Sequence, residues 1–162
     1  MGAGTATAEA FITHFTNKIF EIYHIQGECF LLQEGQKELI DAIKKEQGIL
    51  PHYAGIYLGK EKKGGFEPSL ALLEILSQHS QKKVAIDDKS AWLFLCGRDV
   101  FQQGVVKTYP GINEGLVLVQ NQRDENLGYG KLQRGQIRIK NILDRGDFLR
   151  REMRKKRAPG KN

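Results

Sequence analysis

The residues with the clearest chemical potential are the Lys and Arg side chains at the end of the chain. Residues 145–162 contain eight Lys or Arg and two acidic residues, so this segment accounts for the whole formal net charge of +6 in a chain of 162 residues. Guanidinium and ammonium groups bind phosphate oxygens, and a local excess of them is typical of proteins that contact nucleic acid. The basic terminus therefore predicts a polyanionic partner, with nucleic acid as the first candidate.

A helical wheel over residues 147–157 separates this segment into two faces. The apolar face contains Phe148, Leu149 and Met153. The opposite face is a row of cations that comprises Arg150, Arg151, Arg154 and Arg157, with Lys155 at its margin. We therefore expect a terminal helix that docks through its apolar face and presents the arginines to phosphates. The alternative is a solvated helix end whose cations interact favourably with the helix dipole.

No set of side chains with the spacing of a catalytic or metal site stands out elsewhere. The four histidines lack i,i+4 spacing and have no adjacent Cys pair, and His24 with Cys29 is the nearest approach to metal ligands. A zinc site usually needs four ligands at tighter spacing. The glycines of GYGKL lack the spacing of a nucleotide-binding loop and suit a curved strand better. The sequence thus predicts no catalytic residue, no metal, no cofactor and no small-molecule substrate.

The cysteines, the length of the apolar runs and the first residues indicate the cellular location of the protein. Cys29 and Cys96 lie in apolar runs, which predicts buried free thiols. No run approaches the roughly 18 consecutive apolar residues of a membrane span, and the first residues do not resemble a secretory signal. We therefore expect no membrane partner and a cytoplasmic location, or a nuclear or nucleolar one if the source is eukaryotic.

The apolar pattern of residues 1–80 predicts a small α/β domain. The expected elements are, in order, a helix over 6–20, a hairpin over 21–35, a helix over 36–48, a strand that begins at residue 53 and a central apolar helix with Pro68 in its first turn. The side chains expected to face the core in the first two helices are Phe11, Phe15, Ile19, Leu39, Ile40 and Ile43.

The polar segment SQHSQKK, residues 77–83, is the best candidate for a domain boundary. Beyond it, short apolar runs divided by turn residues are typical of β-strands. They are KVAI, GVVKTY, GLVLVQN, NLGYGKL and QIRIKNIL. Residues 87–97 fit either a buried strand or a helix that Asp87 or Asp88 caps and Gly97 ends. The second half is therefore expected to be a small barrel-like β domain.

The second half resembles a PUA domain, an RNA-binding pseudo-barrel. The matching positions are Gly97, Asp99, Val100, Gly104, Val105, Gly115, Val117, Gly128 and Gly130. The resemblance implies that Asp88–Cys96 is a helix and that the domain spans residues 83–157, followed by a basic tail over 158–162. Two positions depart from the pattern. Gln103 replaces a frequent Pro, and Arg98 replaces a small residue, where it is either an added RNA contact or a plain surface charge.

With its N-terminal half included, the chain resembles the Nip-seven family of ribosome biogenesis factors, in its archaeal form. The resemblance implies an α+β fold with a pre-PUA α/β domain over residues 1–80 and a C-terminal PUA domain. It also implies a protein without catalysis that binds flexible or single-stranded pre-ribosomal RNA and, through the N-terminal domain, other assembly proteins. By position, the implied RNA contacts are Arg150, Arg151, Arg154 and Lys155. The same two-part unit resembles the C-terminal part of RNA cytosine methyltransferases, so an RNA-targeting module that acts with a modifying enzyme is the alternative.

Overall fold

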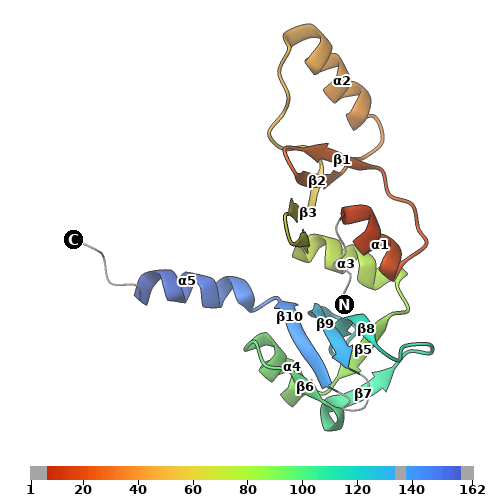
Figure 1. Ribbon diagram of the computed structural model, residues 1–162, viewed down its shortest axis with the longest axis vertical. Helices are drawn as coiled ribbons and strands as arrows, with labels where there is room; N and C mark the ends of the chain where they lie inside the picture. The colour runs from red at the N-terminus through yellow and green to blue at the C-terminus, as the bar shows by residue number, and fades with distance from the viewer. Residues whose placement is uncertain (1–6, 134–137, 158–162) are drawn as a thin grey trace. The chain divides into compact units, whose positions relative to one another are not determined.

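The computed structural model describes residues 7–133 and 138–157, and the side chains of residues 154–157 are not included in that description. The chain divides into two compact units, Met1–His79 and Ser80–Asn162, which are considered separately below (Figure 1). The division falls inside the polar segment 77–83. Among the described residues, no helix combines the length and the apolar content that crossing a membrane requires.

A four-stranded antiparallel sheet in the order β1-β2-β3-β4 is the framework of the first unit. Its strands are β1 (Ile22–Ile25), β2 (Glu28–Leu31), β3 (Ile56–Lys62) and β4 (Gly65–Pro68). The predicted hairpin is present as β1 and β2. Gln26 and Gly27, which join them, both have positive φ angles, the turn geometry that matches the twist of paired strands. The turn sets the register, in which His24 pairs with Cys29.

The described part of the first unit also contains the helices α1 (Ala8–Phe15), α2 (Gln36–Gln47) and α3 (Leu70–His79). Helix α1 is shorter than predicted and leaves Ile19 exposed. It ends because Thr16 adopts an extended conformation and its hydroxyl accepts a hydrogen bond from the Lys18 N–H at 3.1 Å. Such a local side-chain contact competes with the helical hydrogen bonds.

Helices α2 and α3 also differ from the predictions in detail. Helix α2 ends at Gly48 with a φ of 65°, as predicted, but Leu39 is exposed and only Ile40 of that helix is buried. Pro68 belongs to β4 rather than to α3, because the hydroxyl of Ser69 accepts the Leu72 N–H at 3.1 Å and caps the helix one residue later.

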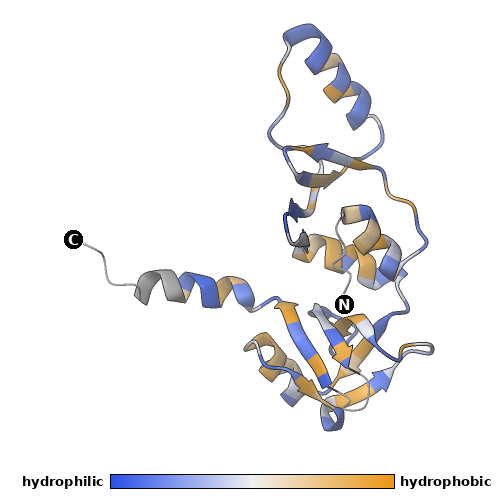
Figure 2. Cartoon of the chain, in the orientation of Figure 1, coloured by the Kyte–Doolittle hydropathy of each residue, from blue (hydrophilic) through white to orange (hydrophobic). Residues whose placement is uncertain are grey.

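Helix α3 supplies much of the core of the first unit, as its apolar sequence predicted. Leu72, Leu73 and Leu76 are fully buried, and hydrophobic residues follow one another along this helix (Figure 2). The ring of Phe11 from α1 packs against the ring of Phe66 from β4, with 5.5 Å between their centres. The helices α1 and α3 therefore share one core with the sheet.

The second unit is a six-stranded β-structure in the order β6-β10-β9-β8-β5-β7. Its strands are β5 (Lys83–Ile86), β6 (Val100–Phe101), β7 (Val105–Thr108), β8 (Gly115–Gln120), β9 (Asn126–Gln133) and β10 (Arg138–Asp144). Strands β5 and β8 pair in parallel, and the other neighbours are antiparallel. All five predicted strand segments are confirmed. Their buried side chains form one core, so the unit is the barrel-like domain that the sequence predicted.

The described part of the second unit also contains the α-helices α4 (Asp88–Leu95) and α5 (Asp147–Arg157). Helix α4 lies within residues 87–97, for which the apolar pattern fitted either a strand or a helix. The carboxylate of Asp87 accepts the Ser90 N–H at 2.6 Å, and this N-cap favours the helix. The PUA-like pattern implied a helix here, and the structure confirms it.

Two glycines of β9 lie where the backbone of β10 approaches closely. Gly128 has a φ of 148°, and a Cβ atom there would collide with the carbonyl oxygen of Leu143. Only glycine tolerates both conditions. The prediction that GYGKL lies in a barrel strand is confirmed.

The two cysteines lie in different environments. Cys29 is buried as predicted, but Cys96 is exposed, so the prediction of a buried thiol is wrong for Cys96. The run WLFLCG is helical, and only one side of a helix can face a core. Phe94 occupies that buried side, whereas Trp92 and Leu93 are exposed.

We expect the two thiols to react at very different rates with a thiol reagent. Burial, together with the nearby carboxylates of Glu61 and Glu9, raises the pKa of Cys29 to about 12. Because the thiolate is the reactive form, Cys29 should stay unreactive in the folded protein at neutral pH while the exposed Cys96 reacts. Labelling with a chromogenic disulfide, before and after addition of denaturant, measures this difference. Rapid labelling of Cys29 in the native Cys96→Ser variant would contradict it.

Candidate nucleic-acid interface

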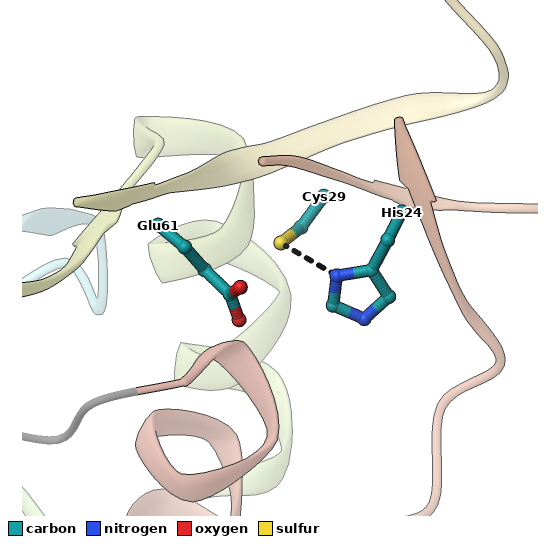
Figure 3. Close-up of side chains that lie close together, drawn as sticks. All are labelled: His24, Cys29 and Glu61. Atoms are coloured by element: carbon teal, nitrogen blue, oxygen red, sulfur yellow. Dashed lines mark hydrogen bonds between the residues drawn. The ribbon is translucent and has the colours of Figure 1, made fainter. Parts of the chain in front are cut away.

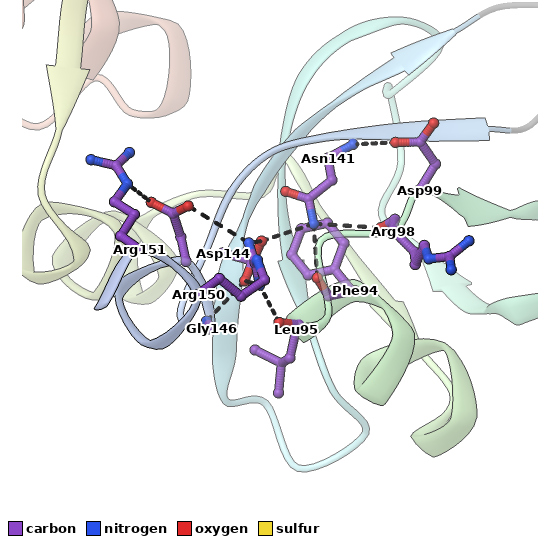
Figure 4. Close-up of polar contacts among 10 residues, drawn as sticks. Phe94, Leu95, Arg98, Asp99, Asn141, Asp144, Gly146, Arg150 and Arg151 are labelled. Atoms are coloured by element: carbon purple, nitrogen blue, oxygen red, sulfur yellow. Dashed lines mark hydrogen bonds and ion pairs between the residues drawn. The ribbon is translucent and has the colours of Figure 1, made fainter. Parts of the chain in front are cut away.

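Arg150 is a structural anchor at the start of helix α5. Its guanidinium pairs with both carboxylate oxygens of Asp144, with Nη2 at 2.7 Å from Oδ2 and Nη1 at 2.9 Å from Oδ1. Asp144 ends β10 and is only 1% exposed. Nη1 also donates to the carbonyl oxygen of Leu95 at the end of α4 (Figure 4). One side chain thus joins β10, α4 and α5.

The carboxylate of Asp144 receives further donors. The Gly146 N–H donates to Oδ1 at 2.8 Å, and the Asn141 side-chain amide donates to Oδ2 at 3.1 Å. A side chain at Gly146 would collide with the carbonyl oxygen of Leu95, so glycine is required where these segments meet. The hydrogen bond to Asp144 is the main reason why the pKa of Arg150 lies above its ordinary value. The guanidinium of Arg150 therefore keeps its positive charge.

This arrangement corrects the picture of a uniform row of exposed arginines. A helical wheel assigns Arg150 to the solvent face, but its guanidinium is held by Asp144 and Leu95 and is only 30% exposed. Arg151 is exposed and pairs with Asp147, 2.6 Å from Nε to Oδ2, within the same helix. Such an exposed pair is weak and readily exchanges for a phosphate contact. The side chains of Arg154 and Lys155 lie outside the described residues.

The predicted docking of α5 through its apolar face is wrong. Phe148, Leu149 and Met153 are 66%, 66% and 55% exposed. The helix is anchored instead at its first turn, through Gly146 and Arg150. The helical wheel separates apolar from basic side chains, but it does not show whether another part of the protein packs against the apolar face.

Arg98 follows α4 and has an exposed side chain. Its backbone carbonyl accepts the Asn141 amide at 3.4 Å, which places Arg98 beside β10. The neighbouring Asp99 accepts the Asn141 N–H at 2.9 Å and the Arg138 Nε at 2.8 Å. Burial alone would raise the pKa of Asp99, but these hydrogen bonds outweigh it and lower the pKa below its ordinary value. Among the described residues, the Arg98 guanidinium has no ionic partner, so it is available to an anion.

The outer face of strands β6, β10 and β9 is a second group of cations that sequence analysis did not single out. Arg138 pairs in register with Phe101, and its guanidinium lies 5.9 Å from the centre of that exposed ring. One step along, Lys140 pairs with Lys131. Hydrophilic and hydrophobic residues alternate along this part of β10 (Figure 2). We call Phe101, Lys131, Arg138 and Lys140 the basic sheet face.

The two lysines of the basic sheet face make it electrostatically unusual. Lys131 and Lys140 lie directly opposite one another on neighbouring strands, and like charges in such positions are destabilising. Arg138 is largely neutralised by Asp99, but both lysines are exposed. The alternation in QIRIK could have revealed Arg138 and Lys140, but nothing in the sequence shows that Lys131 faces Lys140. Two exposed lysines at opposed strand positions are suited to contacts with an anion.

The substitution Lys131→Glu tests whether this pair is strained in the free protein. A glutamate opposite Lys140 replaces repulsion by attraction, so the free energy of unfolding should rise by about 0.2–1 kcal/mol. If the basic sheet face contacts RNA, binding should weaken in the same variant, because a cation is replaced by a charge that repels phosphate. Denaturant unfolding and RNA binding measured on one preparation check both effects. A variant that is less stable and binds equally well would contradict the assignment.

The second unit has the architecture of a PUA domain. Its six strands form a nearly closed barrel, and helix α4 lies between the first two strands in the chain, β5 and β6. The family model described as UPF0113 PUA domain matches residues 82–153. A UPF0113 protein from Archaeoglobus fulgidus is 30% identical to this chain in an alignment of 139 residues, and the match covers 76% of this chain and 79% of the relative. The chain belongs to the UPF0113 family.

A solved structure supports the same fold. A conserved PUA domain protein from Thermoplasma acidophilum aligns with 88% of this chain and 89% of its own, with a TM-score of 0.54 and 18% sequence identity. At that identity the likeness concerns the fold alone. The predicted α+β fold with a C-terminal PUA domain is confirmed.

Proposed function

We propose that this protein is a non-enzymatic RNA-binding factor. The single observation that carries the proposal is a PUA domain whose outer face sets Lys131 against Lys140 and exposes Phe101 beside them. Lysines contact the phosphates of a strand, and an exposed aromatic ring stacks on an unpaired base. Arg98 and Arg151 extend the positive charge toward α5, and Arg154 and Lys155 remain proposed contacts from the sequence.

The arrangement favours flexible or single-stranded RNA over a regular duplex. Bases in an A-form helix are stacked on one another, so Phe101 could not reach a base face there. If Arg98, Lys131, Lys140 and Arg151 each contact one phosphate, log affinity should fall with log salt with a slope of about −3. Between about 50 and 200 mM salt, the affinity for single-stranded RNA should then fall roughly 50-fold.

We further propose that the RNA is a ribosomal precursor and that the protein acts in ribosome assembly, as the Nip-seven resemblance implies. The first unit would bind another assembly protein. In support, it exposes several large apolar side chains on and after α2, namely Leu39, Ile49, Leu50 and Tyr53. Exposed apolar groups of this kind are typical of protein-binding surfaces. The protein would act in the compartment where ribosomal RNA is assembled, which is the cytoplasm of an archaeal cell.

Crosslinking the protein to RNA in cells, followed by sequencing of the bound RNA, tests this proposal. Enrichment of precursor ribosomal RNA is expected. Enrichment of a different RNA class would favour the alternative, an RNA-targeting module that acts with a modifying enzyme. Modification of RNA by the isolated chain in the presence of S-adenosylmethionine would contradict the absence of catalysis.

A further inference from the structure

Three potential metal ligands converge in the first unit. His24 lies in β1, Cys29 in β2 and Glu61 in β3, and their ligand atoms all lie within 4.8 Å of one another (Figure 3). His24 and Cys29 are direct partners in the hairpin register. The Glu61 N–H donates to the carbonyl oxygen of Gly27 at 2.8 Å, which holds Glu61 beside the hairpin turn.

The imidazole of His24 is oriented as in a metal site. Its Nε2 lies 2.8 Å from Oε1 of Glu9, and its Nδ1 lies 3.5 Å from Sγ of Cys29. An ionised carboxylate only accepts hydrogen bonds, so Nε2 carries the proton and Nδ1 presents its lone pair toward the sulfur. A carboxylate behind a histidine in this way is the usual partner of a metal-binding imidazole.

A nucleophilic role for the same residues does not fit their environment. Cys29, His24 and Glu9 line up like a nucleophile, a base and an orienting acid. However, the Cys29 residue is 0% exposed, and its sulfur lies near the carboxylates of Glu61 and Glu9. A substrate cannot reach this sulfur, and the carboxylates disfavour a free thiolate. The same carboxylates favour a bound cation.

We propose that His24, Cys29 and Glu61 bind a divalent transition-metal ion, with zinc as the preferred ion. Zinc bonds of about 2.0–2.3 Å at tetrahedral angles separate neighbouring ligand atoms by about 3.3–3.6 Å. The sulfur and Nδ1 already lie 3.5 Å apart, and a carboxylate oxygen of Glu61 lies within 4.8 Å of both atoms. Imidazole and thiolate together select zinc over magnesium or calcium.

The bound ion would join three neighbouring strands and helix α1. Glu61 Oε1 accepts the Ala8 N–H at 3.2 Å, so the ligand that closes the site also holds the first turn of α1. The His24 side chain is 41% exposed, which provides a path for the ion and leaves its fourth position to water. The site would therefore stabilise the first unit, because binding to the folded state alone raises its stability.

Cobalt titration of the full chain, after removal of metal with a chelator, tests the proposal. We expect one Co²⁺ per chain and a thiolate-to-cobalt charge-transfer absorption, which addition of Zn²⁺ abolishes. The band should vanish in Cys29→Ser and persist in Cys96→Ser, the matched control because Cys96 is the exposed cysteine of the other unit. No band in the wild type, or a band that only Cys96→Ser removes, overturns the proposal.

Two further variants keep the test decisive if Cys29→Ser unfolds. Glu61→Gln retains an oxygen for the Ala8 N–H but loses the charged ligand, and Glu9→Gln loosens the orientation of His24. Loss of such an orienting partner weakens metal affinity by roughly 10–100-fold. We expect weaker Zn²⁺ binding by calorimetry in both variants, with circular dichroism unchanged. Wild-type affinity in both folded variants would also overturn the proposal.

Discussion

Replacing Lys131 and Lys140 together with alanine should weaken binding of single-stranded RNA about 25-fold at about 0.1 M salt. Each phosphate contact with a single strand contributes a salt slope of roughly −0.7, which corresponds to about fivefold in affinity at this salt concentration. The two substitutions should therefore also flatten the slope by about 1.4. Fluorescence anisotropy with a labelled oligonucleotide, measured over a series of salt concentrations, gives both quantities.

The variant Lys44→Ala/Lys45→Ala is a matched control for that measurement. It removes the same charge from exposed positions on α2 in the first unit, and it should leave the affinity and the salt slope close to those of the wild type. Equal losses in the two double variants would mean that RNA responds to net charge alone. In that case the basic sheet face would not be the binding surface.

Replacing Arg150 with alanine should lower the free energy of unfolding of the second unit by about 3 kcal/mol. The substitution leaves the carboxylate of Asp144 buried without its cation, and breaking a buried pair from one side typically costs about 3–5 kcal/mol. We expect the lower end because Gly146 and Asn141 still donate to the carboxylate. Urea unfolding followed by circular dichroism measures the effect.

Two comparisons separate this structural effect from a general loss of charge. Arg151→Ala removes an exposed ion pair and should cost less than about 1 kcal/mol. In an Asp144→Asn background, Arg150→Ala should cost less than it does in the wild type, because no buried charge is left unpaired. If Arg150→Ala and Arg151→Ala lower the free energy of unfolding equally, the inference that Arg150 anchors helix α5 is wrong.

The position of most elements followed from local sequence. The run QIRIKNIL predicted the strand β10. Gly48 predicted the end of α2, and Asp87 was one of two candidate caps for α4. These signals work because hydrogen-bonded caps and the periodicities of helix and strand are properties of a few consecutive residues.

Burial of individual side chains was less predictable. Cys96 stands in an apolar run and Phe148 stands in an apolar arc, yet both are exposed. A helical wheel or an apolar run shows which side chains share a direction, but not whether another element covers them. The opposite error concerns Arg150, which the helical wheel placed on the solvent face. Its side chain is partly buried because Asp144, at the end of the preceding strand, pairs with it on that face.

The sequence by itself determined the class of this protein, an α+β chain with a C-terminal PUA domain and an excess of positive charge at its end. Only the tertiary structure decided which charged side chains and which potential metal ligands meet. Lys131 faces Lys140 because of the register of β9 and β10, and Glu61 reaches His24 and Cys29 because β3 lies beside β2. Periodicity along the chain determines the side of a strand or helix on which each side chain lies. Strand order and register determine its neighbours across the sheet. Strand order and register arise only when segments distant in the sequence pack against one another.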